Sequence, residues 1–151
     1  MTITVFPNGQ VLDLAKSYYA AAEFLTDADA NAILIVNLRC QATELFLKSL
    51  YLTDTATDVG NGVSLFKPSS GRNQGHGLKG SLDKALQEHR DILLSGMPNL
   101  HEELESLEGA FQKSRYLYEN RDSLLLGKAE DVSKFLAEEL PKLHRLVSSA
   151  K

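Results

Sequence analysis

The sequence has one cysteine and no long apolar run. Cys40 is the single cysteine among 151 residues, so no disulfide can form within the chain. The longest unbroken apolar stretch, residues 32–36, is far shorter than the roughly 20 residues that a membrane-spanning helix needs. No segment has the apolar core of a signal peptide. We therefore expect a cytoplasmic protein with no membrane partner.

The patterns of the common metal and catalytic sites are also missing. The four histidines are scattered, and none joins a second histidine one helical turn away or a Cys/His cluster. No Ser/His/Asp or Cys/His arrangement stands out. The glycine-rich segment before His76 lacks the Gly-Lys-Ser/Thr ending of a P-loop. The sequence predicts no catalytic residue, no metal and no cofactor.

Charge is spread unevenly along the chain. The net charge of −4 argues against a protein whose whole surface binds nucleic acid. Residues 61–90 nevertheless contain five Lys or Arg residues against two acidic ones. A local basic region on an acidic body can still bind a phosphate group.

Apolar residues recur at helical spacing over most of the chain. The stripes predict five helices, over residues 11–25, from about 30 to 52, from 76 to 89 or 94, over 100–119 and over 130–149. Asp27 or Asp29 is expected to cap the second helix, and Pro141 to kink or split the last one. The chain is therefore predicted to be all-α, with a single helical-bundle domain over residues 11–151.

Two segments lack a helical pattern. Residues 1–10 are expected to form an N-terminal arm, which the alternation of Thr2-Ile3-Thr4-Val5 allows to be extended. Residues 54–75 contain clusters of glycine, asparagine, serine and proline, and predict a long loop between the second and third helices. Loops of this length inside a domain are usually functional or disordered.

A compact polar row lies on the second helix. Gln41, Glu44 and Lys48 are spaced i, i+3 and i+7, so they share one face, and Glu44 and Lys48 have the spacing of a helical ion pair. The row is either a solvated surface feature or one wall of a cleft, in which Lys48 binds an anion that Glu44 helps to orient. Arg39 is a further candidate donor to that anion.

The expected start of the third helix carries His76 and Lys79. Free backbone N–H groups and the helix dipole attract anions at such a position. The simpler interpretation is that His76 only caps the helix.

A second mixed segment precedes residue 120. Arg115 and Tyr116 stand among other cations and tyrosines, and such residues hold nucleotides through phosphate contacts and base stacking. Alternatively, these cations only complement the negative end of a helix dipole.

Three segments, in this order, resemble the HEPN domain, the "higher eukaryotes and prokaryotes nucleotide-binding" family. They are CQATELFLKSLYL (40–52), GHGLKGSLDKAL (75–86) and SRYLYE (114–119). They are similar to the family's Glu–Lys helix, its His-x-Leu helix start and its late Arg-Tyr pair. The resemblance implies an up-and-down five-helix bundle, a homodimer and a nucleotide-binding cleft.

The resemblance also implies three possible functions. The first is a module that binds a nucleotide or another phosphate-bearing ligand without catalysis of its own. The second is a protein-interaction component of toxin–antitoxin type, the partner of a nucleotidyltransferase. The third is a metal-independent endoribonuclease toxin, which in this family uses an arginine and a histidine with four to six residues between them. Arg72 and His76 have only three residues between them, which disfavours the ribonuclease and enzymatic activity in general.

Overall fold

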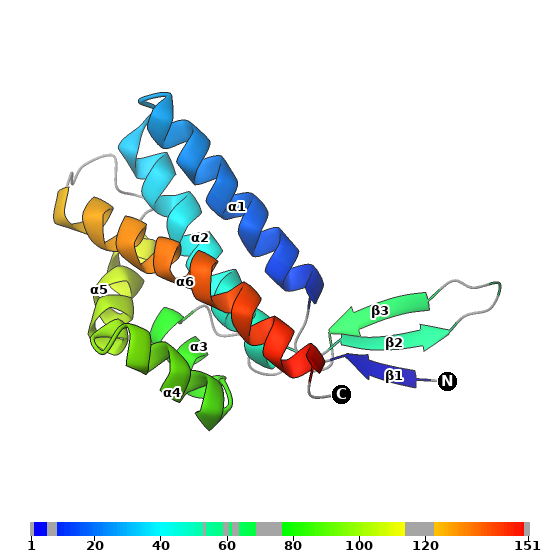
Figure 1. Ribbon diagram of the computed structural model, residues 1–151. Helices are drawn as coiled ribbons and strands as arrows, with labels where there is room; N and C mark the ends of the chain where they lie inside the picture. The colour runs from blue at the N-terminus through cyan, green and yellow to red at the C-terminus, as the bar shows by residue number, and fades with distance from the viewer. Residues whose placement is uncertain are drawn as a thin grey trace.

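The computed structural model describes residues 2–5, 9–52, 54–58, 61, 64–68, 77–113 and 123–149. These residues form six helices: α1 (Gly9–Asp27), α2 (Ala32–Tyr51), α3 (Leu78–Lys84), α4 (Gln87–Gly96), α5 (Leu100–Lys113) and α6 (Ser123–Ser149). They also form three strands: β1 (Thr2–Val5), β2 (Asp54–Asp58) and β3 (Ser64–Pro68). The predominantly helical fold is confirmed, with one helix more than the five expected and with a small sheet in addition (Figure 1).

Helices α1 and α2 form an antiparallel pair joined by a tight turn (Figure 1). Asp29 adopts a left-handed backbone conformation in this turn, with φ 52°, which aspartate tolerates better than most residues. Asn31, not Asp27 or Asp29, caps α2: its side-chain oxygen accepts hydrogen bonds from the backbone N–H groups of Ile33 (2.9 Å) and Leu34 (3.4 Å). The cap prediction was wrong because Asp27 still belongs to α1 and Asp29 lies in the turn before Asn31.

Helix α2 is the central element of the body. It packs against α1 on one side, α6 on another, and α3 and α5 on a third. Its residues from Arg39 to Leu50 are consequently buried around most of the helix circumference. The side of α2 that was expected to be polar is buried as well at Glu44 and Lys48.

The expected third helix is divided in two. Ala85 and Leu86 have extended backbone conformations between α3 and α4. No proline marks this break, and its single nearby glycine is Gly80, inside α3. The break lets α3 pack on α2 and α5 while α4 takes a different direction (Figure 1). Leu82 and Leu93, from the two short helices, are both fully buried as a result.

Helix α6 is longer than expected. It begins at Ser123 rather than near residue 130, and it continues through Pro141 to Ser149 as one helix. The predicted split at Pro141 is therefore not observed. Helix α5 begins at Leu100 with Glu102 and Glu103 in its first turn, where carboxylates complement the positive end of the helix dipole.

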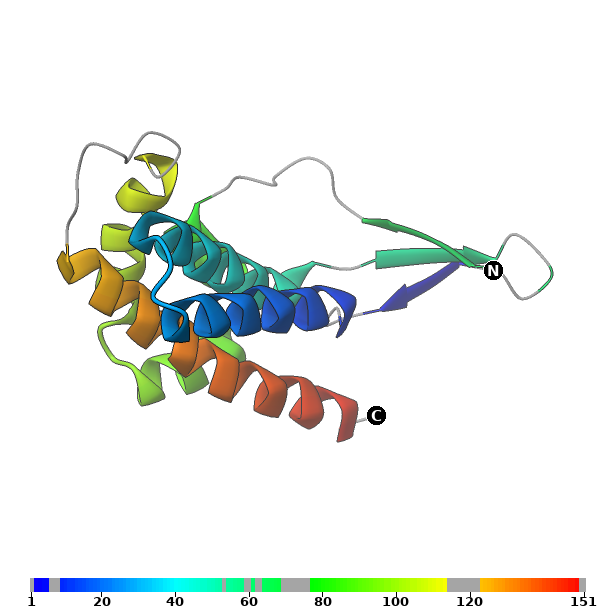
Figure 2. The ribbon, with the colours of Figure 1, turned by 90° about the horizontal axis from the view of Figure 1, so that it is seen from above.

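The three strands form an antiparallel sheet in the order β1-β2-β3. The register pairs Ile3 with Ala56 and Ala56 with Phe66. Strands β2 and β3 fall in the segment expected to be a loop, and Asn61 between them has φ 56°. Viewed from the front and from above, the sheet extends away from the helices (Figures 1 and 2).

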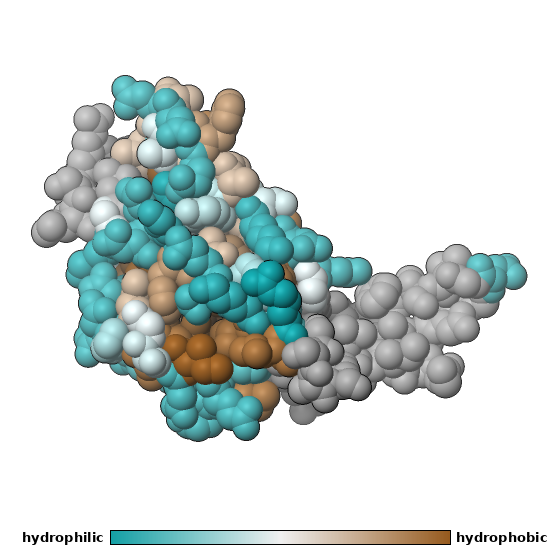
Figure 3. Space-filling model, in the orientation of Figure 1, coloured by the Kyte–Doolittle hydropathy of each residue, from teal (hydrophilic) through white to brown (hydrophobic). Residues whose placement is uncertain are grey.

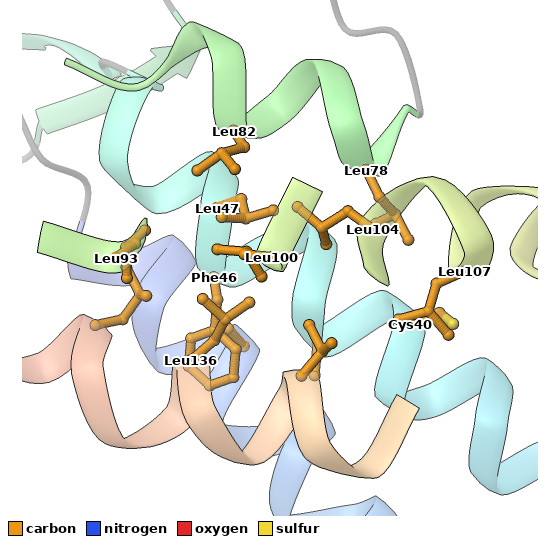
Figure 4. Packing of buried hydrophobic residues seen from close by; sticks show 14 of the residues in the cluster. Cys40, Phe46, Leu47, Leu78, Leu82, Leu93, Leu100, Leu104, Leu107 and Leu136 are labelled. Carbon is orange, nitrogen blue, oxygen red and sulfur yellow. The ribbon is translucent and has the colours of Figure 1, made fainter. Parts of the chain in front are cut away.

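One hydrophobic core joins all six helices. Phe46 and Leu47 of α2 meet leucines from α3, α4, α5 and α6 (Figure 4). Both side chains are fully buried. Each buried side chain of this size contributes about 2 kcal/mol of transfer free energy, more than a typical ion pair on the surface. Core packing therefore sets the positions of the polar groups described next.

Candidate functional site

Glu44 and Lys48 form a buried ion pair on α2. The distance between Oε1 of Glu44 and Nζ of Lys48 is 2.5 Å, and the residues are 7% and 9% exposed. The i, i+4 spacing predicted the pair, and the structure adds its burial. Two charges withdrawn from water are costly, and an apolar pair of similar volume is often as stable. Stability alone therefore does not explain why α2 carries a charged pair at this buried position.

Cys40 lies one helical turn before Glu44 and is fully buried in the core. Burial, together with the nearby Glu44 carboxylate, raises the pKa of its thiol to about 12. The thiol therefore stays protonated and is no nucleophile. Its role is that of a small core residue.

Gln41 is half-buried and is bonded within α2. Its Nε2 donates a hydrogen bond to Oδ1 of Asn37 at 2.8 Å. Gln41 thus shares the face of the Glu44–Lys48 pair, as the spacing predicted, but its amide is oriented by Asn37.

Arg39 lies on the other side of α2 and links three helices. Its Nη1 donates to Oε1 of Glu23 on α1 at 2.9 Å, and its Nη2 donates to Oγ1 of Thr26 on α1 at 3.1 Å. Nη1 also reaches Oγ of Ser133 on α6 at 3.4 Å, and the guanidinium lies 5.8 Å from the centre of the Tyr19 ring. Only 1% of the surface of Arg39 is exposed, and its side chain links α1, α2 and α6. It does not join the polar row of Gln41, Glu44 and Lys48, as had been expected.

Lys79 of α3 is also paired with a carboxylate. Its Nζ lies 3.4 Å from Oε1 of Glu105 on α5, and both side chains are substantially exposed. A Cβ atom added at Gly77 would lie 2.6 Å from Oε1 of Glu108, so a second carboxylate adjoins the residue that precedes α3. These two carboxylates already complement Lys79 and the positive end of the α3 dipole.

Tyr51 and Ser81 connect α2 to α3 beside the buried pair. The Tyr51 hydroxyl and Oγ of Ser81 are 3.2 Å apart, and Nζ of Lys84 lies 5.5 Å from the centre of the Tyr51 ring. Neither residue was predicted from the sequence to belong to the site. Tyr51 stands three positions after Lys48, so extending the polar row by one step would have included it.

The remaining predicted residues, His76, Arg115 and Tyr116, lie outside the described residues, as does Arg72. The structure therefore brings together Glu44 and Lys48, and it places Tyr51, one turn after Lys48, against Ser81 and Lys84 of α3. The approach of the third segment, residues 114–119, to this face stays a prediction.

Two histidines form a second polar cluster between α2, α4 and α6. His144 Nε2 lies 3.0 Å from Oγ of Ser49, and Ser49 donates its hydroxyl hydrogen to the Phe46 carbonyl oxygen at 2.6 Å. Which of Ser49 and His144 donates in their contact depends on the tautomer of the imidazole. Burial lowers the pKa of His144, and neighbouring His89 lowers it further. Burial also lowers the pKa of His89, which is 6% exposed.

Comparison with known proteins yields no match: no family model, no curated protein and no solved structure matches the chain. The resemblance to HEPN domains therefore rests on the three sequence segments alone. None of the helices that the structure describes has the length and apolar character to cross a bilayer. Within the same residues, no group of three or more His, Cys, Asp or Glu side chains is arranged to hold a metal ion.

Proposed function

We propose that this chain is a HEPN-like helical module that binds a nucleotide or another phosphate-bearing ligand beside α2 and α3, without catalysis of its own. The observation that carries the proposal is the buried Glu44–Lys48 pair. A buried charge pair contributes little to stability compared with apolar residues, so its presence in the centre of the body favours a role in binding.

The chemistry of the pair suits an anion. The Lys48 ammonium has three N–H donors, and Glu44 occupies one side of it. A phosphate oxygen can accept a hydrogen bond from a further donor, while Glu44 holds the lysine in place. Tyr51 and Lys84 extend the polar surface toward α3. His76, Lys79, Arg115 and Tyr116 are the predicted companions from the other segments.

Isothermal titration with ATP, GTP and short single-stranded RNAs tests the proposal. The informative variant is Glu44→Gln/Lys48→Gln, because it removes both charges and leaves no unpaired charge in the interior. The matched control is Glu139→Gln/Lys142→Gln, which removes a pair of the same kind from the surface of α6. We expect at least one probe to bind, about tenfold loss in the first variant and no change in the second. Absence of binding by every probe would refute the proposal.

Arg115→Ala tests the third segment separately. A loss of affinity for the same probe would support the predicted participation of Arg115 and Tyr116. Unchanged affinity in Arg115→Ala, with loss in Glu44→Gln/Lys48→Gln, would limit the site to α2 and α3.

A second function, that of a partner for another protein, is favoured by a different observation. Arg39, Lys48 and Lys79 are each paired with a carboxylate of the same chain. These cations are thus neutralised without a ligand, as expected if their role is purely structural. Co-expression with the product of a neighbouring nucleotidyltransferase gene, followed by size-exclusion chromatography, tests this alternative. Separate elution of the two proteins would count against it.

A further inference from the structure

An open groove of about 490 Å³ lies between α6 and the connection from α4 to α5. Met97, Val132 and Phe135 supply its apolar lining. Gly96 allows the aromatic ring to lie close to α4, since a Cβ atom there would be 2.8 Å from Cε2 of Phe135. In the space-filling view, apolar surface lies between α6 and the end of the body formed by α4 and α5, with hydrophilic residues at its border (Figure 3).

Carboxylates surround the apolar lining. Glu103, Asp131 and Glu138 line the groove together with Lys134. Glu103 is partly neutralised by Lys128, whose Nζ lies 3.9 Å from Oε1. Asp131 and Glu138 are exposed and form no ion pair with any described residue. The groove therefore offers two exposed carboxylates, neither of them ion-paired within the described part of the chain, beside an aromatic ring.

We propose that this groove binds a segment of a partner protein in which an arginine adjoins an apolar side chain. A guanidinium forms hydrogen bonds with carboxylates and stacks on aromatic rings, so Asp131 and Glu138 match its first mode of contact and Phe135 its second. The apolar neighbour would fill the space over Met97 and Val132. The volume lies in the range of sites for small ligands, and suits a few side chains rather than a whole helix.

The same charges disfavour a phosphate or nucleotide here, because two carboxylates repel an anion. The groove lies on α6 and the start of α5, whereas the proposed ligand site lies on α2 and α3. The two proposals thus fail or succeed independently.

Fluorescence anisotropy with a labelled peptide of about seven alternating leucine and arginine residues tests the inference. The control peptide carries citrulline, a neutral analogue of similar shape, in place of each arginine. We expect the arginine peptide to bind about tenfold more tightly than the citrulline peptide. In ¹⁵N–¹H spectra, the perturbed amides should belong to residues 96–103 and 131–138. Equal binding of both peptides, or perturbation confined to other residues, would overturn the proposal.

Two double variants on α6 separate the groove from general attraction to an acidic surface. Asp131→Asn/Glu138→Gln removes the two exposed carboxylates of the groove, and Glu130→Gln/Glu139→Gln removes two carboxylates of the same helix that do not line it. We expect about tenfold loss of peptide affinity in the first and less than about twofold loss in the second. Equal loss in both would show binding to acidic surface alone. Equally tight binding of free arginine amide would indicate a small-molecule site and refute a peptide partner.

Discussion

Replacing Arg39 by methionine should lower the free energy of unfolding by about 3 kcal/mol. The side chain is buried between α1, α2 and α6, and its guanidinium binds Glu23 and Thr26. Methionine retains most of the volume of the aliphatic stem, so the expected loss comes from the polar contacts rather than from a cavity.

The magnitude follows from the individual contacts. A hydrogen bond to a charged group contributes about 1.5–3 kcal/mol, and the lower value applies to Glu23 because its side chain is 44% exposed. The bond to Thr26 contributes about 1 kcal/mol. The contact with the Tyr19 ring adds about 0.5 kcal/mol. The 3.4 Å contact with Ser133 is too long to add much.

Urea unfolding monitored by circular dichroism measures the loss, with Arg145→Met on the exposed surface of α6 as the control. The control should change stability by less than about 0.5 kcal/mol. A double-mutant cycle with Glu23→Gln adds a second criterion: the double variant should match Arg39→Met within about 0.5 kcal/mol, because the contact is already absent. A loss below about 1 kcal/mol in Arg39→Met, or additive losses in the cycle, would refute the reasoning.

Three further predictions concern the core and its edges. Cys40 should resist thiol reagents in the native protein and react only on unfolding, because burial raises its pKa to about 12; rapid labelling of folded protein would contradict this. The pKa values of His89 and His144 are lowered in the folded protein, so the unfolded chain binds protons more readily. Urea titrations should therefore show the free energy of unfolding falling as the pH drops below 6.5. The fall should be less steep in His144→Gln. Gly96→Ala should cost about 1–3 kcal/mol through contact with the Phe135 ring, and Phe135→Leu should reduce that penalty.

Local periodicity was enough to place the main helices. The spacing of apolar residues predicted α1, α2 and the start of α5, because a helical stripe is a property of residues three and four apart. The same rule predicted the Glu44–Lys48 contact, which depends on one turn of α2.

The boundaries that depend on packing were not predicted. The break at Ala85 and Leu86 has no proline, and it forms where α3 and α4 leave in different directions. The hairpin of β2 and β3 also escaped prediction, since Asp54–Asp58 and Ser64–Pro68 carry few of the branched apolar residues typical of strands. These elements form because of contacts with other segments, so a single segment contains little sign of them.

By itself, the sequence determined that this chain is largely helical, that Glu44 and Lys48 meet, and that residues 61–90 are locally basic. Tertiary structure alone decided that the Glu44–Lys48 pair is buried and that Arg39 serves α1 and α6 instead of the polar row. The physical reason is the distance along the chain over which each effect acts. Helical spacing and neighbouring charge act within one turn, whereas burial and the partner of a long side chain depend on which distant segments the core draws together.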